Sequence, residues 1–455
     1  MTGIQKKAVL LLFTLIIPHA AITQTTVLDR SKCRQLAIEH SKQLRQSENK
    51  EKQALLKERI AKTGFLPEFS ASGLYYYSPH EFEYSLGLGT LLGMEGNLRE
   101  MMDKDLPDAA LSIGMEGVTM AGVEAEQAVY LGGRVRTAVN MAETGAGIAG
   151  LNVEMHISEV ITVADSAWFN YLSAKEAKSA ALQYEKTLEE LVQATRESVE
   201  EGLATRNDLL KAKVKRNEAS LKVQKAGSGV ELAEMFLCRV TGLPLHTEIT
   251  TEKSQLPEEV DYSILQKNEQ SPENRPEYKM LEKAVDLEKY EEKMARAEML
   301  PEVGIKASYN HMRGVDIGGH KTDDLVFSVM GSVKIPIFNW GERQNRLAKA
   351  NLETEAAQIE KEDTRELMQL EIAEARLTFE NARKRLELTG KALEQSKENM
   401  ETSKDMYNEG KETIVELLEA KAHWKSAKSK HINARTNVLL SKTLYKKTLG
   451  ILTTK

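Results

Sequence analysis

Aromatic residues are scarce in this chain, and so are long apolar runs. Only 5% of the 455 residues are aromatic, whereas 29% are charged. Ala, Glu, Lys and Leu dominate long stretches, a composition that suits long helices packed along narrow seams better than a deep globular core. Beyond the N-terminal segment there is no run of 18 apolar residues, so we expect no transmembrane helix.

Clusters of reactive residues are also missing from the sequence. The net charge of −6 is mild and the charges interleave, so neither a basic patch for nucleic acid nor a disordered acidic tail is indicated. The nine histidines show no metal-ligand spacing, and no nucleophile stands in a pattern with a base. We therefore expect a protein that is not an enzyme and that binds no metal, cofactor or nucleic acid.

The N-terminus has the pattern of a secretory signal. Lys6 and Lys7 precede the apolar run "AVLLLFTLII", and the small and polar residues "PHAAITQ" follow it. We predict a signal peptide over residues 1–23, cleaved between Ala21 and Thr23; the alternative is a buried N-terminal helix. If an exported chain without apolar helices enters a membrane, a closed β-barrel is the remaining way to satisfy its backbone there.

One thirteen-residue segment, which we call the duplicated phrase, occurs twice in similar form. "EGLATRNDLLKAK" starts at Glu201 and "EGKETIVELLEAK" starts at Glu409, 208 residues later, with seven of thirteen positions identical. Other pairs follow in the same order in both halves: the Leu-Pro-Glu segments at Pro67 and Pro301, and the glycine-arginine turns at Gly132 and Gly341. The chain is therefore an internal duplication, and its first half carries about 25 extra residues near 79–110.

Each half contains a helix, a pair of strands and a helical hairpin, in that order. After the signal peptide the predicted parts are an N-terminal helix (24–66), a first β-hairpin (67–130) with a long external loop (79–110), a first helical hairpin (131–242), a linker (243–272), a helix (273–300), a second β-hairpin (301–338) and a second helical hairpin (339–455).

The strands are predicted from alternation of apolar and polar residues. Apolar side chains and glycines occupy every second position in three segments: Phe69 to Tyr77, Val303 to Tyr309 and Leu325 to Ile335. About 9 to 11 tilted residues suffice for a strand to cross a bilayer. Any half-buried hairpin shows the same alternation, so the pattern alone does not decide the environment.

The helices are predicted from a seven-residue repeat. Large residues recur at Ile372, Phe379 and Leu386, each with a small residue three positions later, and again at Leu417 and Trp424. A large residue that faces a small one at this spacing lets two helices interdigitate in a left-handed coiled-coil seam.

The duplicated phrase is predicted to form the tip of each helical hairpin. Gly202 and Gly410 suit the left-handed residue that ends a helix. Thr205 with Asp208, and Thr413 with Glu416, match the capping box that starts the next helix. The first arm of each hairpin has nearly 70 residues, on the order of 100 Å of helix.

One glycine-rich segment matches a dinucleotide-binding motif but lacks the structural context that the motif needs. "GAGIAG", residues 145–150, fits the dinucleotide fingerprint letter for letter. That fingerprint needs a preceding strand and a βαβ unit, whereas a helical segment precedes this one. We expect small residues that allow close packing or a bend.

With these repeated features the chain resembles the outer-membrane efflux proteins, the TolC-like channels of Gram-negative bacteria. The resemblance rests on the duplicated "LPE" strand starts, the "GGR" and "GER" turns and the two tips, and it covers about Thr25 to Thr448. It implies an α+β membrane protein in which three chains, with four strands each, form a twelve-stranded outer-membrane β-barrel. A long periplasmic α-helical barrel of coiled-coil hairpins continues it.

The resemblance also implies a periplasmic gate at the tips. On the second tip Tyr407 precedes Gly410, and Glu416 and Glu419 would ring the aperture; on the first tip Asp208 would bond the tyrosine. Three chains would gather six carboxylates around one axis and favour cations. Simpler roles are capping for Asp208 and Glu416, seam packing for Tyr407 and a solvated helix face for Glu419.

One gate position departs from the family pattern. The family has an arginine two residues after the second-tip glycine, and this chain has Glu412. Arg206 on the opposite tip would restore the pair with the charges reversed. The resemblance also places Cys33 near Cys238; in an oxidising compartment they form either a disulfide or two inert buried thiols.

The resemblance implies an outer-membrane exit duct of a tripartite efflux system. Its partners would be two further copies of the chain, outer-membrane lipid, a periplasmic adaptor at the tips and an inner-membrane pump of the RND or ABC type. One alternative is the outer-membrane component of a type I protein secretion system. Another, of a different class, is a periplasmic coiled-coil scaffold without a pore.

Overall fold

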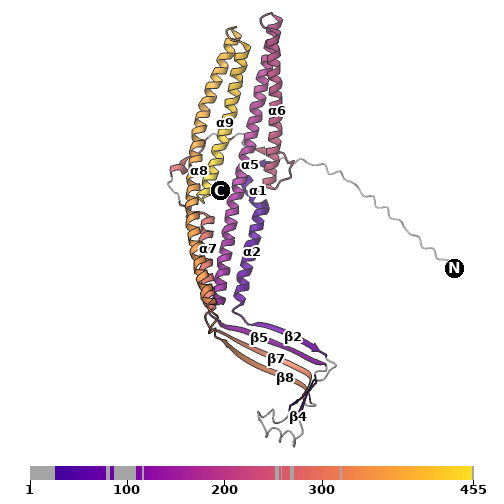
Figure 1. Cartoon of the computed structure of the whole chain (residues 1–455). Helices are drawn as coiled ribbons and strands as arrows, with labels where there is room; N and C mark the ends of the chain where they lie inside the picture. The colour runs from indigo at the N-terminus through magenta and orange to yellow at the C-terminus, as the bar shows by residue number, and fades with distance from the viewer. Residues whose placement is uncertain are drawn as a thin grey trace, which may run out of the picture. The chain divides into compact units, whose positions relative to one another are not determined.

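The computed structural model describes residues 26–77, 82–86, 109–114, 117–251, 256–257, 259–266, 271–317 and 320–452. The predicted signal peptide and most of the predicted external loop, residues 87–108, lie outside these ranges. The chain divides into two compact units: residues 1–44, 157–271 and 370–455 form the first, and 45–156 and 272–369 the second. Helices α5 (Arg134–Glu200) and α8 (Glu342–Asn408) contribute residues to both (Figure 1).

The first unit is built from two helical hairpins. Helix α5 continues into α6 (Arg206–Thr241), and α8 continues into α9 (Ile414–Thr448) (Figure 1). Beside them lie α1 (Arg30–His40), the 3-10 helix η1 (Ser263–Gln266) and the parallel strands β1 (Thr26–Leu28) and β6 (Ile249–Thr251). The two hairpins touch through polar contacts between α5 and α9, such as Lys428 Nζ to Gln183 at 2.5 Å.

The main core of this unit follows the predicted seven-residue repeat. Ile372, Ala375 and Phe379 of α8 are buried, and so are Val438 and Tyr445 of α9. The Phe379 ring lies 6.3 Å from that of Tyr445, between centroids. Large and small residues thus interdigitate as predicted, and the heptad pattern is confirmed over these positions.

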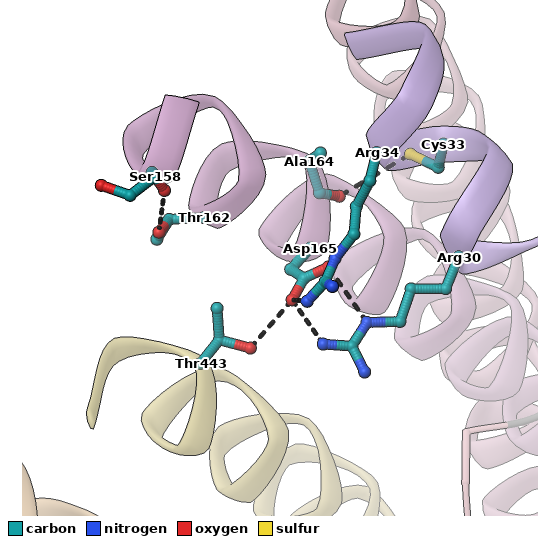
Figure 2. A network of polar contacts seen from close by, with 8 residues as sticks. All are labelled: Arg30, Cys33, Arg34, Ser158, Thr162, Ala164, Asp165 and Thr443. Atoms are coloured by element: carbon teal, nitrogen blue, oxygen red, sulfur yellow. Dashed lines mark hydrogen bonds and ion pairs between the residues drawn. The ribbon is translucent and has the colours of Figure 1, made fainter. Parts of the chain in front are cut away.

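A buried ion network fastens three helices of this unit (Figure 2). Asp165 of α5 is fully buried and accepts hydrogen bonds from Arg30 and Arg34 of α1 and from Thr443 of α9, at 2.5–3.0 Å. Burial alone would raise the pKa of Asp165, but the hydrogen bonds and charges of Arg34 and Arg30 outweigh it and lower the pKa. Removing one partner of such a pair typically costs about 3–5 kcal/mol.

The two cysteines form no disulfide, which corrects that alternative. Both thiols are free and fully buried in the same core. The Cys33 sulfur lies 3.8 Å from the carbonyl oxygen of Ala164, and the Cys238 sulfur lies 3.6 Å from that of Thr247. Each thiol is thus directed at a backbone acceptor. Burial raises the pKa of Cys33 to about 12, so this group stays an unreactive thiol.

The second unit begins with helices. These are α2 (Lys42–Thr63), α7 (Pro276–Ala297) with the short η2 (Pro272–Asn274) before it, and the first parts of α5 and α8. The "GAGIAG" segment is helical, within α5, as predicted. A Cβ on Gly147 would meet the Lys283 side chain of α7 at 3.0 Å, so this glycine permits close packing. None of the helices in the described ranges contains an apolar stretch long enough to cross a membrane.

Four long antiparallel strands make up the sheet of this unit. They are β2 (Glu68–Tyr76), β5 (Val118–Leu131), β7 (Glu302–Ile317) and β8 (His320–Lys334), hydrogen-bonded in that order (Figure 1). The register aligns Phe69, Ala125, Ala307 and Val329 across the four strands. The next residues, Ser70, Glu124, Ser308 and Ser328, align on the other face.

The two faces of the sheet therefore differ, as the alternation predicts. On the apolar face Phe69 is 77% and Phe327 is 68% exposed in the single chain. On the other face Lys306 Nζ forms an ion pair with Glu124 at 2.6 Å. Such alternation is what a sheet with lipid on one side and water on the other requires.

Two further strands lie at the predicted external loop, one within it and one across its C-terminal boundary. β3 (Phe82–Leu86) pairs with β4 (Ala109–Gly114), and β4 extends the sheet beside the end of β7. The sequence predicts a loop over 79–110 and no strands there. The two strands are only five and six residues long, too short for a period-two pattern to be recognised.

The glycine turn joins strand to helix as predicted. Gly132 and Gly133, between β5 and α5, have φ of +63° and +87°. A Cβ on Gly132 would lie 2.6 Å from the Ala297 carbonyl oxygen, so a side chain there is excluded by space as well as by backbone conformation. The following Arg134 pairs with Glu302 at the start of β7. This ion pair links the repeated "GGR" and "LPE" segments.

Candidate functional site at the hairpin tips

Both hairpin tips have the turn that the sequence predicts. Gly202 and Gly410 have φ of +76° and +75°. The amide of the next residue reaches back five positions in each case: Leu203 N to Ser198 O, and Lys411 N to Met406 O, both 2.8 Å. These bonds satisfy carbonyls at the helix end and define the same C-terminal turn twice.

Both capping boxes are also present, as predicted. Thr205 Oγ1 accepts from the Asp208 amide at 3.2 Å, and the Asp208 carboxylate accepts from the Thr205 amide at 3.3 Å. Thr413 and Glu416 repeat this at 3.4 and 2.7 Å. The hydrogen bond from the Thr205 side chain lowers the pKa of Asp208, and the Thr413 amide lowers that of Glu416. Both carboxylates are therefore ionised at neutral pH.

An apolar cluster joins the two tips. We call it the tip cluster; its buried members come from α5, α6 and α9 and are Tyr184, Leu188, Leu191, Val192, Ala212, Ala219, Ile414, Leu417 and Leu418. Tyr407 of α8 packs against it, as its place in the seam predicts. Within one described chain Tyr407 forms no hydrogen bond with Asp208, whose other contact is Lys211 Nζ at 3.5 Å.

The remaining predicted gate residues differ in their surroundings. Glu416 and Glu419 are both exposed on α9. Glu412 accepts a hydrogen bond from Ser403 of α8. Arg206 is exposed and, in the part of one chain that the structure describes, forms no ion pair with Glu412. Any such pair has to form between copies.

A buried lysine near the second tip was missed. Lys421 of α9 is only 3% exposed. Burial, and to a lesser extent the charge of nearby Lys404, lower its pKa to about 8, although Glu190 opposes the shift. The spacing could have predicted this burial, because Lys421 lies four residues after Leu417 and three before Trp424 and so shares their apolar helix face.

With this fold and these tips established, similarity to known proteins identifies the class. The sequence matches the family described as "Outer membrane efflux protein" over residues 33–242 and 269–449. These two segments correspond to the two halves of the duplication. The chain belongs to the outer membrane efflux protein family.

Individual relatives agree with this assignment. The outer membrane efflux protein BepC of Brucella suis biovar 1 (strain 1330) is 23% identical over 266 residues, 58% of this chain and 57% of BepC. The match thus spans little more than half the length of that relative.

Two solved structures share the fold. CusC, described as forming a transmembrane channel, aligns with a TM-score of 0.73 and 15% identity over 94% of this chain and 93% of its own. The open state of the Neisseria gonorrhoeae outer membrane channel MtrE aligns with a TM-score of 0.70 and 23% identity, over 92% and 88%. The predicted TolC-like fold and outer-membrane location are confirmed.

Proposed function

We propose that this chain is the outer-membrane exit duct of a tripartite efflux system, passing substrates from a periplasmic adaptor and an inner-membrane pump to the exterior. The observation that carries the proposal is the four-stranded sheet with one exposed apolar face. Strand β2 pairs only with β5, and β8 pairs only with β7, among the described residues. Two free edges and an apolar face cannot remain open in lipid.

Further copies of the chain can pair with both free strand edges and close the sheet, so that its apolar face is directed at lipid. When β8 of one copy pairs with β2 of the next, a head-to-tail interface repeats until the ring closes. Three copies give twelve long strands around a lumen lined by the polar face. The apolar face, which includes Phe69, Tyr309 and Phe327, then meets lipid.

The helices of the first unit carry matching apolar stripes. On α6 the exposed apolar residues follow spacings close to whole helical turns: Leu210, Val214, Leu221, Leu232 and Phe236. On α8 they are Leu370, Leu377, Leu388 and Met406. Exposed stripes of this length indicate helix contacts between copies, and they support an α-helical barrel.

The tips then form the gate of this duct. Three copies bring Glu416 and Glu419 together as six carboxylates near one axis, which favours cations. Asp208 and Tyr407 meet across copies, and Arg206 of one copy pairs with Glu412 of the next. The tips also carry the adaptor-binding surface. The pump, of the RND or ABC type, supplies the energy, because we assign no catalytic role to the duct.

Conductance of the purified full-length protein in planar bilayers tests the duct. Wild-type protein should give discrete conductance steps with cation preference. The pair Glu416→Gln and Glu419→Gln should reduce that preference, whereas Glu398→Gln and Glu401→Gln, exposed glutamates at the same spacing on α8, should not. Absence of steps would refute the duct and favour a scaffold; unchanged selectivity in the tip pair would refute only the gate.

The charge-reversed pair has its own test. Arg206→Glu and Glu412→Arg should each raise leak conductance, since each places like charges together. The double variant restores the pair and should leak less than either single variant. A double variant that leaks as much as the singles would contradict the pairing.

A further inference from the structure

A group of apolar side chains is exposed where β8 ends and α8 begins. Ile335, Ile337, Phe338 and Trp340 follow the last residue of β8, and all four are more than half exposed; Trp340 is 89% exposed. The Phe338 ring meets the Trp340 ring edge to face, with 4.9 Å between their centroids. We call these four residues the junction patch. Neither the proposed gate nor the proposed strand pairing between copies uses it.

The backbone of Trp340 has a conformation that favours glycine. Its φ is +57°, and among the described residues it is the one non-glycine residue with a positive φ. A bulky side chain in this conformation costs free energy that glycine avoids. Within the described part of the chain little offsets this cost, because the ring touches Phe338 only at an edge and its N–H has no hydrogen-bond partner.

The other half of the duplication has a glycine at the equivalent position. The helix starts at Arg134 and Glu342 align the two strand-to-helix junctions, which places Gly132, with φ of +63°, opposite Trp340. At Gly132 a Cβ would lie 2.6 Å from the Ala297 carbonyl oxygen, so that junction has no room for a side chain. The second junction makes the same turn with an exposed indole ring. The turn does not need this ring, so a contact outside the chain is what favours it.

The junction patch continues the apolar face of the sheet. On β8 this face has exposed apolar residues from Leu325 to Val333, and beyond Leu325 it becomes polar at Asp323, which pairs with His311. The eight residue steps from Leu325 to Val333 measure about 26 Å, or about 20 Å along the membrane normal at a tilt of about 40°. The lipid-facing band of a membrane barrel is about 25 Å tall. The band therefore extends past Val333, and the junction patch lies at its boundary on the helix side.

We infer that the junction patch is a membrane-interface anchor, in which the Trp340 and Phe338 rings insert between the phospholipid headgroups of the periplasmic leaflet. The inference rests on the proposed duct, in which the apolar face of the sheet meets lipid. An indole suits this depth because its ring is apolar and its N–H donates to a phosphate or ester oxygen. The lipid contact offsets the cost of the left-handed backbone. It also fixes the height of the sheet-to-helix boundary in the bilayer.

Fluorescence quenching by brominated phosphatidylcholine tests the anchor in full-length protein reconstituted into vesicles. The chain has three tryptophans, and because Trp168 and Trp424 are buried helix residues, Trp340 is the exposed fluorophore. Bromine at the headgroup end of the acyl chains should quench about twofold more than bromine at the methyl end. Trp340→Phe should abolish the quenching by either lipid.

A second tryptophan position gives the depth control. Val329→Trp in the Trp340→Phe background puts the indole in the middle of the apolar band, where bromine at the methyl end should quench more strongly. If Val329→Trp is quenched by lipid and Trp340 is not, the anchor is wrong and the duct stands. If neither is quenched, the lipid-facing sheet of the duct is wrong as well.

Three results for Trp340 would overturn the anchor. Stronger quenching by bromine at the methyl end would place the ring in the acyl interior. Quenching by aqueous iodide alone would place it in water. Quenching by neither iodide nor lipid would mean that a neighbouring copy covers the patch. The wild-type protein is sufficient for all three measurements, so they remain decisive even if a variant fails to fold.

Discussion

The two hairpin tips share a turn but differ in what surrounds it. Both have a left-handed glycine and a capping box with the same hydrogen bonds. The first helical residue is the exposed Arg206 in one tip and the buried Ile414 in the other. Farther along, Lys213 is exposed whereas its counterpart Lys421 is buried.

This difference separates two kinds of information in the duplicated phrase. The residues that remain identical, such as the glycines and threonines, define the local turn. Burial does not follow identity in the same way: Arg206 and Ile414 differ in residue type, but Lys213 and Lys421 are identical and still differ in burial. One repeat thus supplies two equal turns, and the packing around each tip decides how deeply its helix is buried.

The largest expected effect comes from making the second tip resemble the first. Ile414→Arg puts an unpaired charge into the tip cluster, which should destabilise the chain by about 3–5 kcal/mol. The reciprocal Arg206→Ile should change stability little, because position 206 is exposed. Thermal unfolding of the purified proteins measures both. Equal effects of the two substitutions would show that the tips are equivalent after all.

Lys421→Met should stabilise the chain by about 1–3 kcal/mol at pH 7, because it removes a charge whose pKa burial lowers to about 8. The folded state binds the proton less tightly than the unfolded state, so wild-type stability rises between about pH 8 and 10.5. The advantage of the variant should shrink over that window. Lys213→Met is the exposed control, and a stabilisation as large there would contradict the role of burial.

The glycines should be equally sensitive to substitution. Ala at Gly202 or Gly410 has to adopt a left-handed conformation, which costs about 1–2 kcal/mol. Neither site has any atom near a new Cβ, so the backbone alone sets the cost. Unfolding midpoints of the two variants should shift together; a shift in one alone would mean that packing distinguishes the turns.

The smallest effects should come from the caps. Thr205→Ala and Thr413→Ala each remove one side-chain acceptor, a loss of about 1 kcal/mol. Serine at either position keeps the acceptor and should restore most of the stability. If serine fails to rescue, the contribution of threonine lies in its methyl group instead of its hydroxyl.

What the sequence predicted correctly depends on short-range periodicity. The turn at Gly410, the cap at Thr413 and the seam through Phe379 each follow from residues within one or two heptads. The apolar face of the sheet follows from period two in the same way, and the register confirms it.

The features that were missed depend on contacts between distant segments. Asp165 meets Arg34 across 131 residues, and no local pattern indicates such a pair. The sequence left open whether Cys33 and Cys238 form a disulfide or two buried thiols, because that depends on which atoms each sulfur faces. The strands β3 and β4 are too short to give a periodic signal, and the proposed gate pairs need a second copy.

Single-particle electron microscopy of the membrane-extracted protein tests the central claim most directly. The account predicts a threefold particle in which β8 of each copy pairs with β2 of the next, closing twelve long strands into one barrel. A particle that contains one copy, with the apolar face of its sheet folded onto its own helices, would contradict it.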